Sequence, residues 1–155
     1  MMLGIVCSDG KALPSIWIKG NLNGKQYKQI LGRKVFPALN STYGHGQWVW
    51  QQDGAPCHTS NDVQKYLMSK LVSEGFWPKD FWPPSLPNLN PLDYHVWMLI
   101  EDKACANAHS SVDDLKKSVE AVWNSLSQKN LHKACHSFRG RLVACIEADG
   151  GIFEK

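Results

Sequence analysis

Asp53 follows a segment that would fix the direction of its carboxylate. Residues 47–52 alternate bulky and polar side chains, the pattern of a strand with two tryptophans on one face. Gly54 and Pro56 come directly after the acid, and Asp-Gly is a common turn pair because glycine accepts positive φ. Taken alone, Asp53 is most simply a turn residue, and a catalytic interpretation needs a second acid.

Asp93 is a second acid in a fixed position. Asn90 and Pro91 are suited to the N-cap and first position of a helix, and an acid three residues after the N-cap is typical of a capping box. Asp93 also shares a stripe with Trp97 and Ile100, so we expect its carboxylate to face the interior of the protein.

The region around Asp93 offers it no cation, because no Lys or Arg occurs between Lys79 and Lys103. An inward-facing charge then needs a partner or a metal. One acid ends a strand and the other begins a helix that should cover the sheet. Mg²⁺ prefers hard oxygen ligands and usually takes one or two carboxylates with water and phosphate. Two such ions, about 3.5–4 Å apart, can activate the attacking oxygen and stabilise the leaving one in phosphodiester chemistry.

The elements that would position these acids form a mixed α/β domain with helices on a small sheet. Residues 3–8 and 12–18 are expected strands joined by a hairpin at Asp9-Gly10. Helices are expected at residues 23–34 and from Thr59 or Ser60 to about Lys70. The stretch 76–91 holds five prolines, which exclude a helix or an inner strand, and we expect aromatic anchors to order it: Phe76, Trp77, Phe81 and Trp82.

Two amphipathic helices are expected in residues 111–155, after a sheet and acid-bearing core in residues 1–110. The first begins at Ser111, in a pattern close to a capping box, and runs through Leu126. The second stops near Gly150-Gly151. Its inward stripe is expected to hold Leu131, Cys135, Phe138, Leu142 and Ile146.

The composition is that of one globular domain. The chain has 155 residues, 43% of them hydrophobic and 20% charged. No apolar run approaches the ~20 residues that span a membrane, so no membrane partner is predicted. The start of the chain is too short and lacks the basic residues for a signal peptide. Five scattered cysteines indicate a reducing compartment.

Positive charge gathers in the first part of the chain. The net charge of +3 divides into +5 for residues 1–46, −4 for 47–102 and +2 for 103–155. The acidic middle could bind cations and the basic flanks could bind polyanions. Charge differences of this size between segments also occur in ordinary solvated surfaces. The candidate phosphate contacts are Lys25, Lys28, Arg33 and Lys34, and a solvated helix face is the simpler interpretation of them.

Both acids lie in segments that resemble a known family. Residues 51–60 (QQDGAPCHTS) resemble the second acid block of mariner-type transposases, and residues 82–97 (WPPSLPNLNPLDYHVW) resemble the third. Residues 4–11 are similar to the strand and hairpin that follow the first acid strand of that family. Residues 27–31 and 141–151 also fit, so the resemblance covers nearly the whole chain.

The resemblance implies a ribonuclease-H-like fold with a three-carboxylate site that uses Mg²⁺ or Mn²⁺. It implies cleavage of transposon-end DNA, joining of the ends to target DNA, and a place in the nucleus, and it leaves homo-oligomerisation open. Asp53 and Asp93 match the second and third acids. His58 matches a motif position where it would orient the turn or approach the scissile phosphate, and a structural histidine is at least as simple an interpretation.

The sequence departs from the family pattern at its start. The first acid would lie on a strand upstream of residues 2–8, where this chain begins. We therefore expect the first strand, the first acid and the N-terminal helix-turn-helix region to be missing. A site without its shared ligand should be a weak one-metal site at most, and the isolated chain should be inactive. Asn88 also stands where the family usually has an acid.

Two other functions fit parts of the sequence. The first is a non-catalytic remnant of the same fold that binds nucleic acid or partner subunits. The second is a zinc site, for which the absence of any Cys-x-x-Cys pair is unfavourable. The available zinc-ligand types are His132, Cys135 and His136, the pair Cys57 and His58, and the pair Cys105 and His109.

Overall fold

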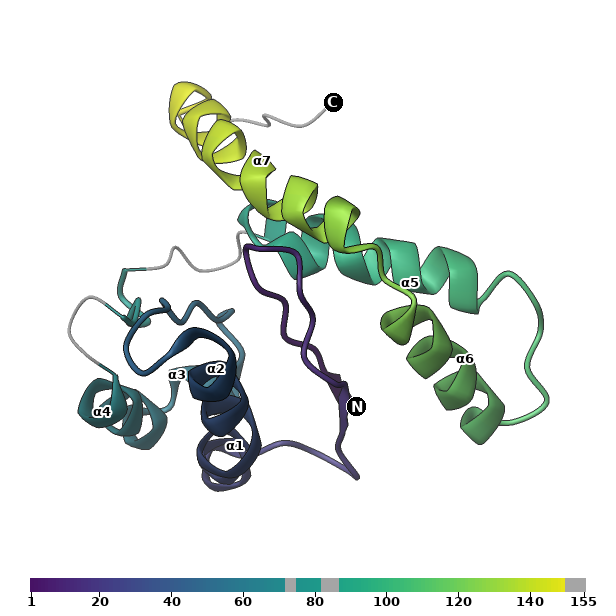
Figure 1. The fold of residues 1–155 in the computed structure, drawn as a ribbon, viewed down its shortest axis with the longest axis horizontal. Helices are drawn as coiled ribbons and strands as arrows, with labels where there is room; N and C mark the ends of the chain where they lie inside the picture. Colours follow the sequence, from purple (N-terminus) through teal and green to yellow (C-terminus); the bar gives the residue numbers. More distant parts are fainter. Residues whose placement is uncertain (72–74, 82–86, 150–155) are drawn as a thin grey trace. The chain divides into compact units, whose positions relative to one another are not determined.

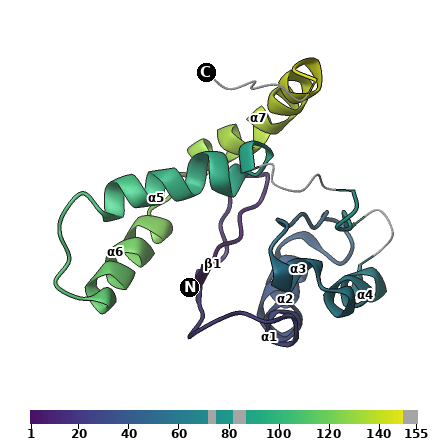
Figure 2. The same cartoon turned by 180° about the vertical axis from the view of Figure 1, so that it is seen from behind.

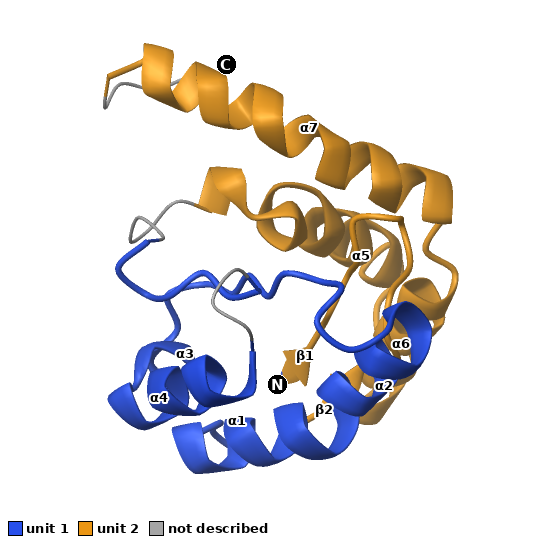
Figure 3. Ribbon diagram, turned by 60° about the vertical axis from the view of Figure 1, so that its left-hand side comes forward, with its two compact units in different colours: residues 1, 18–85 blue, residues 2–17, 86–155 orange. Residues whose placement is uncertain are grey.

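A computed structural model of the chain describes residues 1–71, 75–81 and 87–149 (Figure 1). The chain divides into two compact units, the first formed by residues 1 and 18–85 and the second by residues 2–17 and 86–155 (Figure 3). Two sequence expectations fall outside the described residues, namely the anchor Trp82 and the stop at Gly150-Gly151.

The first unit is built on one long interrupted helix. It comprises α1 (Gly24–Ile30), the π-helix η1 (Leu31–Val35) and α2 (Phe36–Tyr43). The prediction ended this helix at Lys34, which is nine residues too early. In the π-turn the backbone hydrogen bonds reach five residues back instead of four, and Phe36 N–H donates to the Leu31 carbonyl. Pro37, which lacks an N–H, follows directly after this turn, and the helix continues through it.

The rest of the first unit packs against this helix. The short helix α3 (Pro56–Thr59) precedes α4 (Asn61–Lys70). The predicted helix to Lys70 is confirmed, but no side chain caps its start and α3 was not predicted. The buried hydrophobic core of the unit consists of Tyr27, Leu31, Val35, Phe36, Leu39, Trp50, Val63, Leu67 and Phe76.

The strand expected at residues 47–52 is wrong as a regular element. Only Trp50 pairs, in an isolated parallel bridge with Phe76. Trp50 N–H donates to the Gly75 carbonyl (2.7 Å) and its own carbonyl accepts from Trp77 N–H (3.2 Å). Alternating aromatics therefore reflect packing here, since the rings of Trp48 and Trp50 both lie beside Phe36 (centroids 5.5 and 5.8 Å away).

The second unit begins with the expected hairpin. Strand β1 (Met2–Leu3) pairs antiparallel with β2 (Ile16–Trp17), and Gly10 makes the turn at φ +90°. The paired strands are shorter than predicted, because Pro14 has no N–H to donate to the ladder. Closer to the turn, the pairing consists of one isolated bridge between Val6 and Ala12. The described residues therefore contain one two-stranded sheet rather than a larger mixed sheet.

Helices complete the second unit (Figure 2). The 3-10 turn η2 (Pro87–Leu89) leads to the π-helix η3 (Leu92–Val96) and α5 (Trp97–Ala104), which contacts α6 (Val112–Asn124). Ser111 caps α6 as predicted, accepting from Asp114 N–H. No helix in the described part of the chain is both long and apolar enough to cross a membrane.

The last helix, α7 (Gln128–Glu147), is buried only along its first half. Leu131 is 2% exposed, and Ala134 is also buried. The predicted inward stripe is wrong beyond Phe138, since Leu142 and Ile146 are 37% and 68% exposed. Helical periodicity identifies a face, but it does not say how far along that face a partner extends.

The core of the second unit closes on two stacked tryptophans. Trp97 and Trp123 lie with ring centroids 5.8 Å apart, and Trp123 Nε1–H donates to the Leu13 carbonyl (2.9 Å). A Cβ atom on Gly4 would lie 2.5 Å from the Trp123 ring and 2.7 Å from the Trp97 ring. The hairpin can therefore approach this pair only because residue 4 has no side chain.

Gly4→Ala should destabilise the chain by about 1–3 kcal/mol, because two rigid rings must move to admit a methyl group. Gly140→Ala is the matched control, since a Cβ there would meet no described atom within 4 Å and alanine favours a helix by about 0.5–1 kcal/mol. Urea-unfolding midpoints should move in opposite directions. A Gly4→Ala variant as stable as the unmodified chain would contradict this packing.

Candidate functional site

The Asp53 carboxylate is held by two hydrogen bonds to one oxygen. Its Oδ1 accepts from Ala55 N–H (3.0 Å) and lies 2.6 Å from His58 Nδ1. An ionised carboxylate can only accept, so Nδ1 is the donor. The His58 hydrogen bond lowers the pKa of Asp53 below its usual value, and this effect outweighs the opposing effect of partial burial. The Asp53 side chain is 49% exposed and is therefore a fixed, ionised carboxylate facing solvent.

His58 is fixed by its ring and by its backbone. The residue is only 8% exposed, and its ring lies 4.3 Å from the Tyr27 ring between centroids. The His58 carbonyl accepts from two side-chain amides, Gln52 Nε2 (3.0 Å) and Gln64 Nε2 (2.9 Å). The histidine that orients Asp53 is thus anchored on both sides.

Gln52 and Gln64 connect this arrangement to the rest of the unit. Gln52 Oε1 accepts from the Tyr27 hydroxyl (3.0 Å) and from Trp50 Nε1–H (3.1 Å). Burial raises the pKa of Tyr27, so its hydroxyl stays protonated as a donor. Gln64 Oε1 accepts from Lys79 N–H (3.0 Å). Sequence reasoning missed both glutamines, although Gln64 is a polar residue on the inward stripe of α4.

Asp93 lies in the second unit, within η3. Asn90 Oδ1 accepts from Leu92 N–H (3.1 Å), so the predicted capping role of Asn90 is confirmed. The Asn90 side-chain amide also donates to Asp93 Oδ2 (2.8 Å). A neutral amide three residues earlier therefore donates to the partly buried Asp93, in a region where the sequence contains no Lys or Arg.

Two hydrogen bonds fasten α7 to η3 and to the preceding turn η2 within the second unit. The Tyr94 hydroxyl donates to the Ala134 carbonyl (2.6 Å), and Arg141 Nε–H donates to the Asn88 carbonyl (2.6 Å). The Arg141 guanidinium also lies 4.1 Å above the centre of the Tyr94 ring. Sequence reasoning missed Arg141, whose partners are more than forty positions away in the chain and leave no local signal.

The sequence is similar to known transposases. It is 29% identical over 143 residues to the Tcb1 transposase of Caenorhabditis briggsae, a match that covers 92% of this chain and 50% of that protein. It is 30% identical over 125 residues to the Tc1 transposase of Caenorhabditis elegans, covering 81% of this chain and 43% of that protein. The chain thus spans about half the length of these curated relatives. No family model matches the chain.

Solved structures of another transposase share the fold. The Mos1 transposase catalytic domain, solved with raltegravir and Mn, gives a TM-score of 0.79 at 21% identity, covering 94% of this chain and 74% of that one. The Mos1 paired-end complex with its left transposon end gives 0.81 at 20% identity, covering 99% and 44%. The chain is thus similar in sequence to the Tcb1 and Tc1 transposases, and similar in fold to the Mos1 transposase catalytic domain.

Each unit contains only some of the site residues that were expected to lie together. The structure brings His58 to Asp53 in the first unit, while Asp93 belongs to the second. Within the described ranges, no three His, Cys, Asp or Glu side chains gather as metal ligands. Cys135 was a candidate zinc ligand, and its thiol instead donates to the Cys7 carbonyl.

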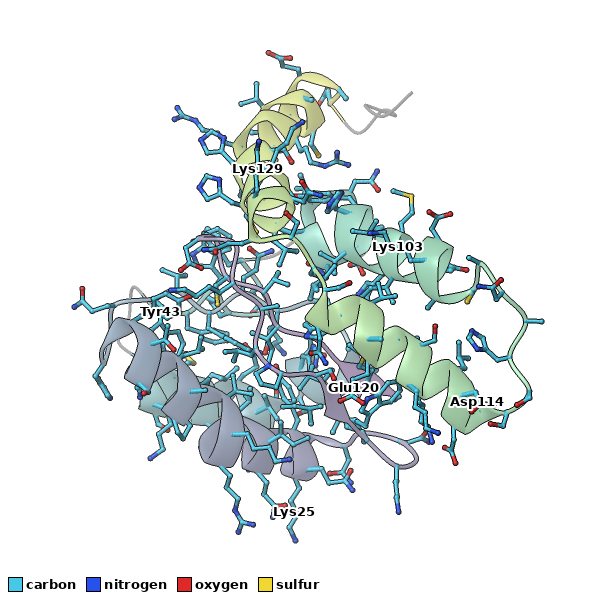
Figure 4. All side chains as sticks on the ribbon, turned by 45° about the vertical axis from the view of Figure 1, so that its right-hand side comes forward. Lys25, Tyr43, Lys103, Asp114, Glu120 and Lys129 are labelled. Atoms are coloured by element: carbon cyan, nitrogen blue, oxygen red, sulfur yellow. The ribbon has the colours of Figure 1, made fainter. Side chains whose placement is uncertain are left out.

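The four basic candidates of the first unit are not equivalent. Lys28 forms an ion pair with Asp62 of α4. Lys25, Arg33 and Lys34 are exposed, and Figure 4 shows Lys25 extending away from α1. The remaining exposed basic candidates are therefore these three residues.

Asp53→Asn should lower stability near neutral pH, by about 1 kcal/mol or less because the side chain is half exposed. A lowered folded-state pKa means that ionised Asp53 stabilises the fold above the ordinary carboxyl pKa, and that this contribution disappears as pH falls through the folded-state pKa. Urea-unfolding midpoints of the two proteins should therefore converge in acid.

The same substitution made in a His58→Gln background is the control. Without the imidazole donor, Asp53→Asn should have a smaller effect at neutral pH and little dependence on pH. A stability difference between the unmodified chain and the Asp53→Asn variant that stays constant with pH would show that the His58 contact does not determine the ionisation of Asp53.

Proposed function

We propose that the chain is part of a transposase catalytic domain that cleaves and joins DNA strands with Mg²⁺ or Mn²⁺. The observation that carries the proposal is the oriented Asp53 carboxylate, in a chain whose relatives are transposases. The proposal also includes a ribonuclease-H-like fold, transposon-end and target DNA as partners, a nuclear location and homo-oligomerisation. Residues 1–110 would form the acid-bearing core and residues 111–155 the C-terminal helices.

Asp53 has the properties of a ligand for a hard cation. Its Oδ1 is engaged by His58 and Ala55, whereas Oδ2 makes no hydrogen bond to any described residue. Mg²⁺ and Mn²⁺ favour carboxylate oxygen and tolerate sites with only one or two protein ligands. His58 would act as a positioning residue that keeps the carboxylate ionised and correctly turned.

Asp93 would supply the second carboxylate, with the Asn90 amide holding one of its oxygens. A bound divalent ion supplies activation of the attacking oxygen and stabilisation of the leaving oxygen in phosphodiester chemistry. The chain itself provides two acids, each oriented by a donor close by in sequence. The expected inactivity of the isolated chain stays a prediction.

Mn²⁺ binding should depend on both acids. Asp53→Asn and Asp93→Asn are each expected to weaken Mn²⁺ affinity by about tenfold or more, because loss of even an outer-shell partner weakens metal sites by about 10–100-fold. Electron paramagnetic resonance of free Mn²⁺ during a protein titration measures this directly.

Asp80→Asn and Asp102→Asn are matched controls, since each removes an exposed carboxylate from the same unit as one of the two acids. Both should bind Mn²⁺ as the unmodified chain does. Equal losses in all four variants would indicate diffuse binding to surface acids, and no Mn²⁺ binding at millimolar metal would remove the proposal.

A binding module without chemistry is the second candidate, and the exposed trio Lys25, Arg33 and Lys34 favours it. Replacing all three with Gln should reduce the slope of log affinity for duplex DNA against log salt by about 3, because each lost phosphate contact contributes about 0.9. Lys28→Gln should change the slope less, since Asp62 already neutralises that charge. An unchanged slope in the triple variant would exclude this face.

A further inference from the structure

Residues 129–139 of α7 present a basic face to solvent. It consists of Lys129, His132, Lys133, His136 and Arg139, all of them exposed, and it is called the α7 basic face below. Figure 4 labels Lys129 on this helix. The spacing of three and four residues puts these side chains on one side of a helix, about 5–6 Å apart between neighbours.

The charge of this face is not balanced within the helix. Between Gln128 and Ile146, α7 contains no acid, and its first acid is Glu147. None of the five side chains forms an ion pair with a described residue. Lys129 and Lys133 are like charges four residues apart and repel one another, so an anion bound between them would relieve a repulsion present in the free protein.

The neighbouring helix α6 shows the contrasting arrangement. Its Lys116 pairs with Asp113 (2.8 Å) and its Lys117 lies 4.0 Å from Asp114, each three residues away. Figure 4 shows Asp114 and Glu120 along this helix. An ordinary solvated helix face in this protein therefore mixes both signs, and the α7 basic face does not.

The α7 basic face is rigidly mounted. The opposite side of the same turns holds the buried Leu131 and Ala134. The backbone carbonyl of Ala134 is further fixed by the Tyr94 hydroxyl. A ligand on this face would meet a preformed row of donors rather than a helix that must first become ordered.

The dimensions of the row suit a nucleic-acid backbone. Ten residue steps from Lys129 to Arg139 span about 15 Å. One strand of duplex DNA presents a phosphate about every 3.4 Å along the axis, so about four phosphates fall within that length. The exposed side of these turns has no large apolar side chain before Leu142, which disfavours insertion into a lipid surface.

We propose that the α7 basic face binds the phosphate backbone of duplex DNA as a sequence-independent contact surface. The proposal rests on the proposed function only in taking DNA as the polyanion. It adds a contact surface on the unit that contains Asp93, whereas Lys25, Arg33 and Lys34 belong to the other unit.

The test measures binding of the whole chain to a fluorescent duplex oligonucleotide in EDTA buffer, between ~50 and ~200 mM salt. Replacing Lys129, Lys133 and Arg139 with Gln removes three contacts, each contributing a slope of about 0.9. Raising the salt fourfold weakens the affinity of each protein by some factor, and this factor should be about 40-fold smaller for the variant than for the unmodified chain. The control replaces Lys103, Lys116 and Lys117 with Gln, which changes net charge equally, and it should leave the slope nearly unchanged.

Three outcomes would overturn the inference: an unchanged slope in the α7 variant, equal changes in the α7 and control variants, or binding to anionic vesicles without binding to DNA. Mn²⁺ binding, measured on the same α7 variant, separates the inference from the proposed function. Intact Mn²⁺ binding with an unchanged DNA slope would remove only the α7 contact. Absent Mn²⁺ binding with the expected DNA slope would remove only the metal chemistry.

Discussion

The position of Asp53 depends on satisfying the buried polar atoms around His58. The His58 carbonyl has two lone pairs, and Gln52 and Gln64 occupy both. Each glutamine then has an oxygen of its own to satisfy, which Gln52 does through the Tyr27 hydroxyl. A buried network of this kind is stable only when every member is paired. One exposed carboxylate is therefore oriented by a chain of contacts that reaches the interior of its unit.

The two acids are oriented by the same principle with different donors. Asp53 receives an imidazole N–H from five residues ahead, and Asp93 receives an amide N–H from three residues behind. In both cases the donor lies within about one turn of helix, so the local backbone sets the geometry. Local donors allow each acid to be oriented within its own unit, whatever cation or phosphate the carboxylate meets.

Features with local causes were predictable from the sequence, and features with distant causes were not. The hairpin at Asp9-Gly10 and the caps at Asn90 and Ser111 depend on adjacent residues, and the structure contains all three. The strand at residues 47–52 required a pairing partner that periodicity cannot reveal, and only Trp50 has one. The predicted burial of the C-terminal end of α7 is wrong for the same reason, because an apolar stripe does not show where the element packed against it ends. His58 was found through its motif, whereas Gln64 and Arg141 act on residues that no local pattern connects to them.

The contacts between η3 and α7 give the second unit a property that neither element has alone. Tyr94 directly follows Asp93 and bonds to Ala134, which lies between Lys133 and Cys135 on the helix that bears the basic face. Arg141 ties the same helix to Asn88, two residues before the Asn90 cap. Because packed elements shift together rather than deform continuously, a backbone phosphate bound on α7 would be held at a fixed offset from the Asp93 carboxylate. Under the two proposals, a phosphate contact and a metal-binding carboxylate on one rigid unit would reduce the positional freedom that must otherwise be lost before reaction. If both proposals hold, this unit would keep bound DNA in register with Asp93 better than a basic segment on a separate loop could.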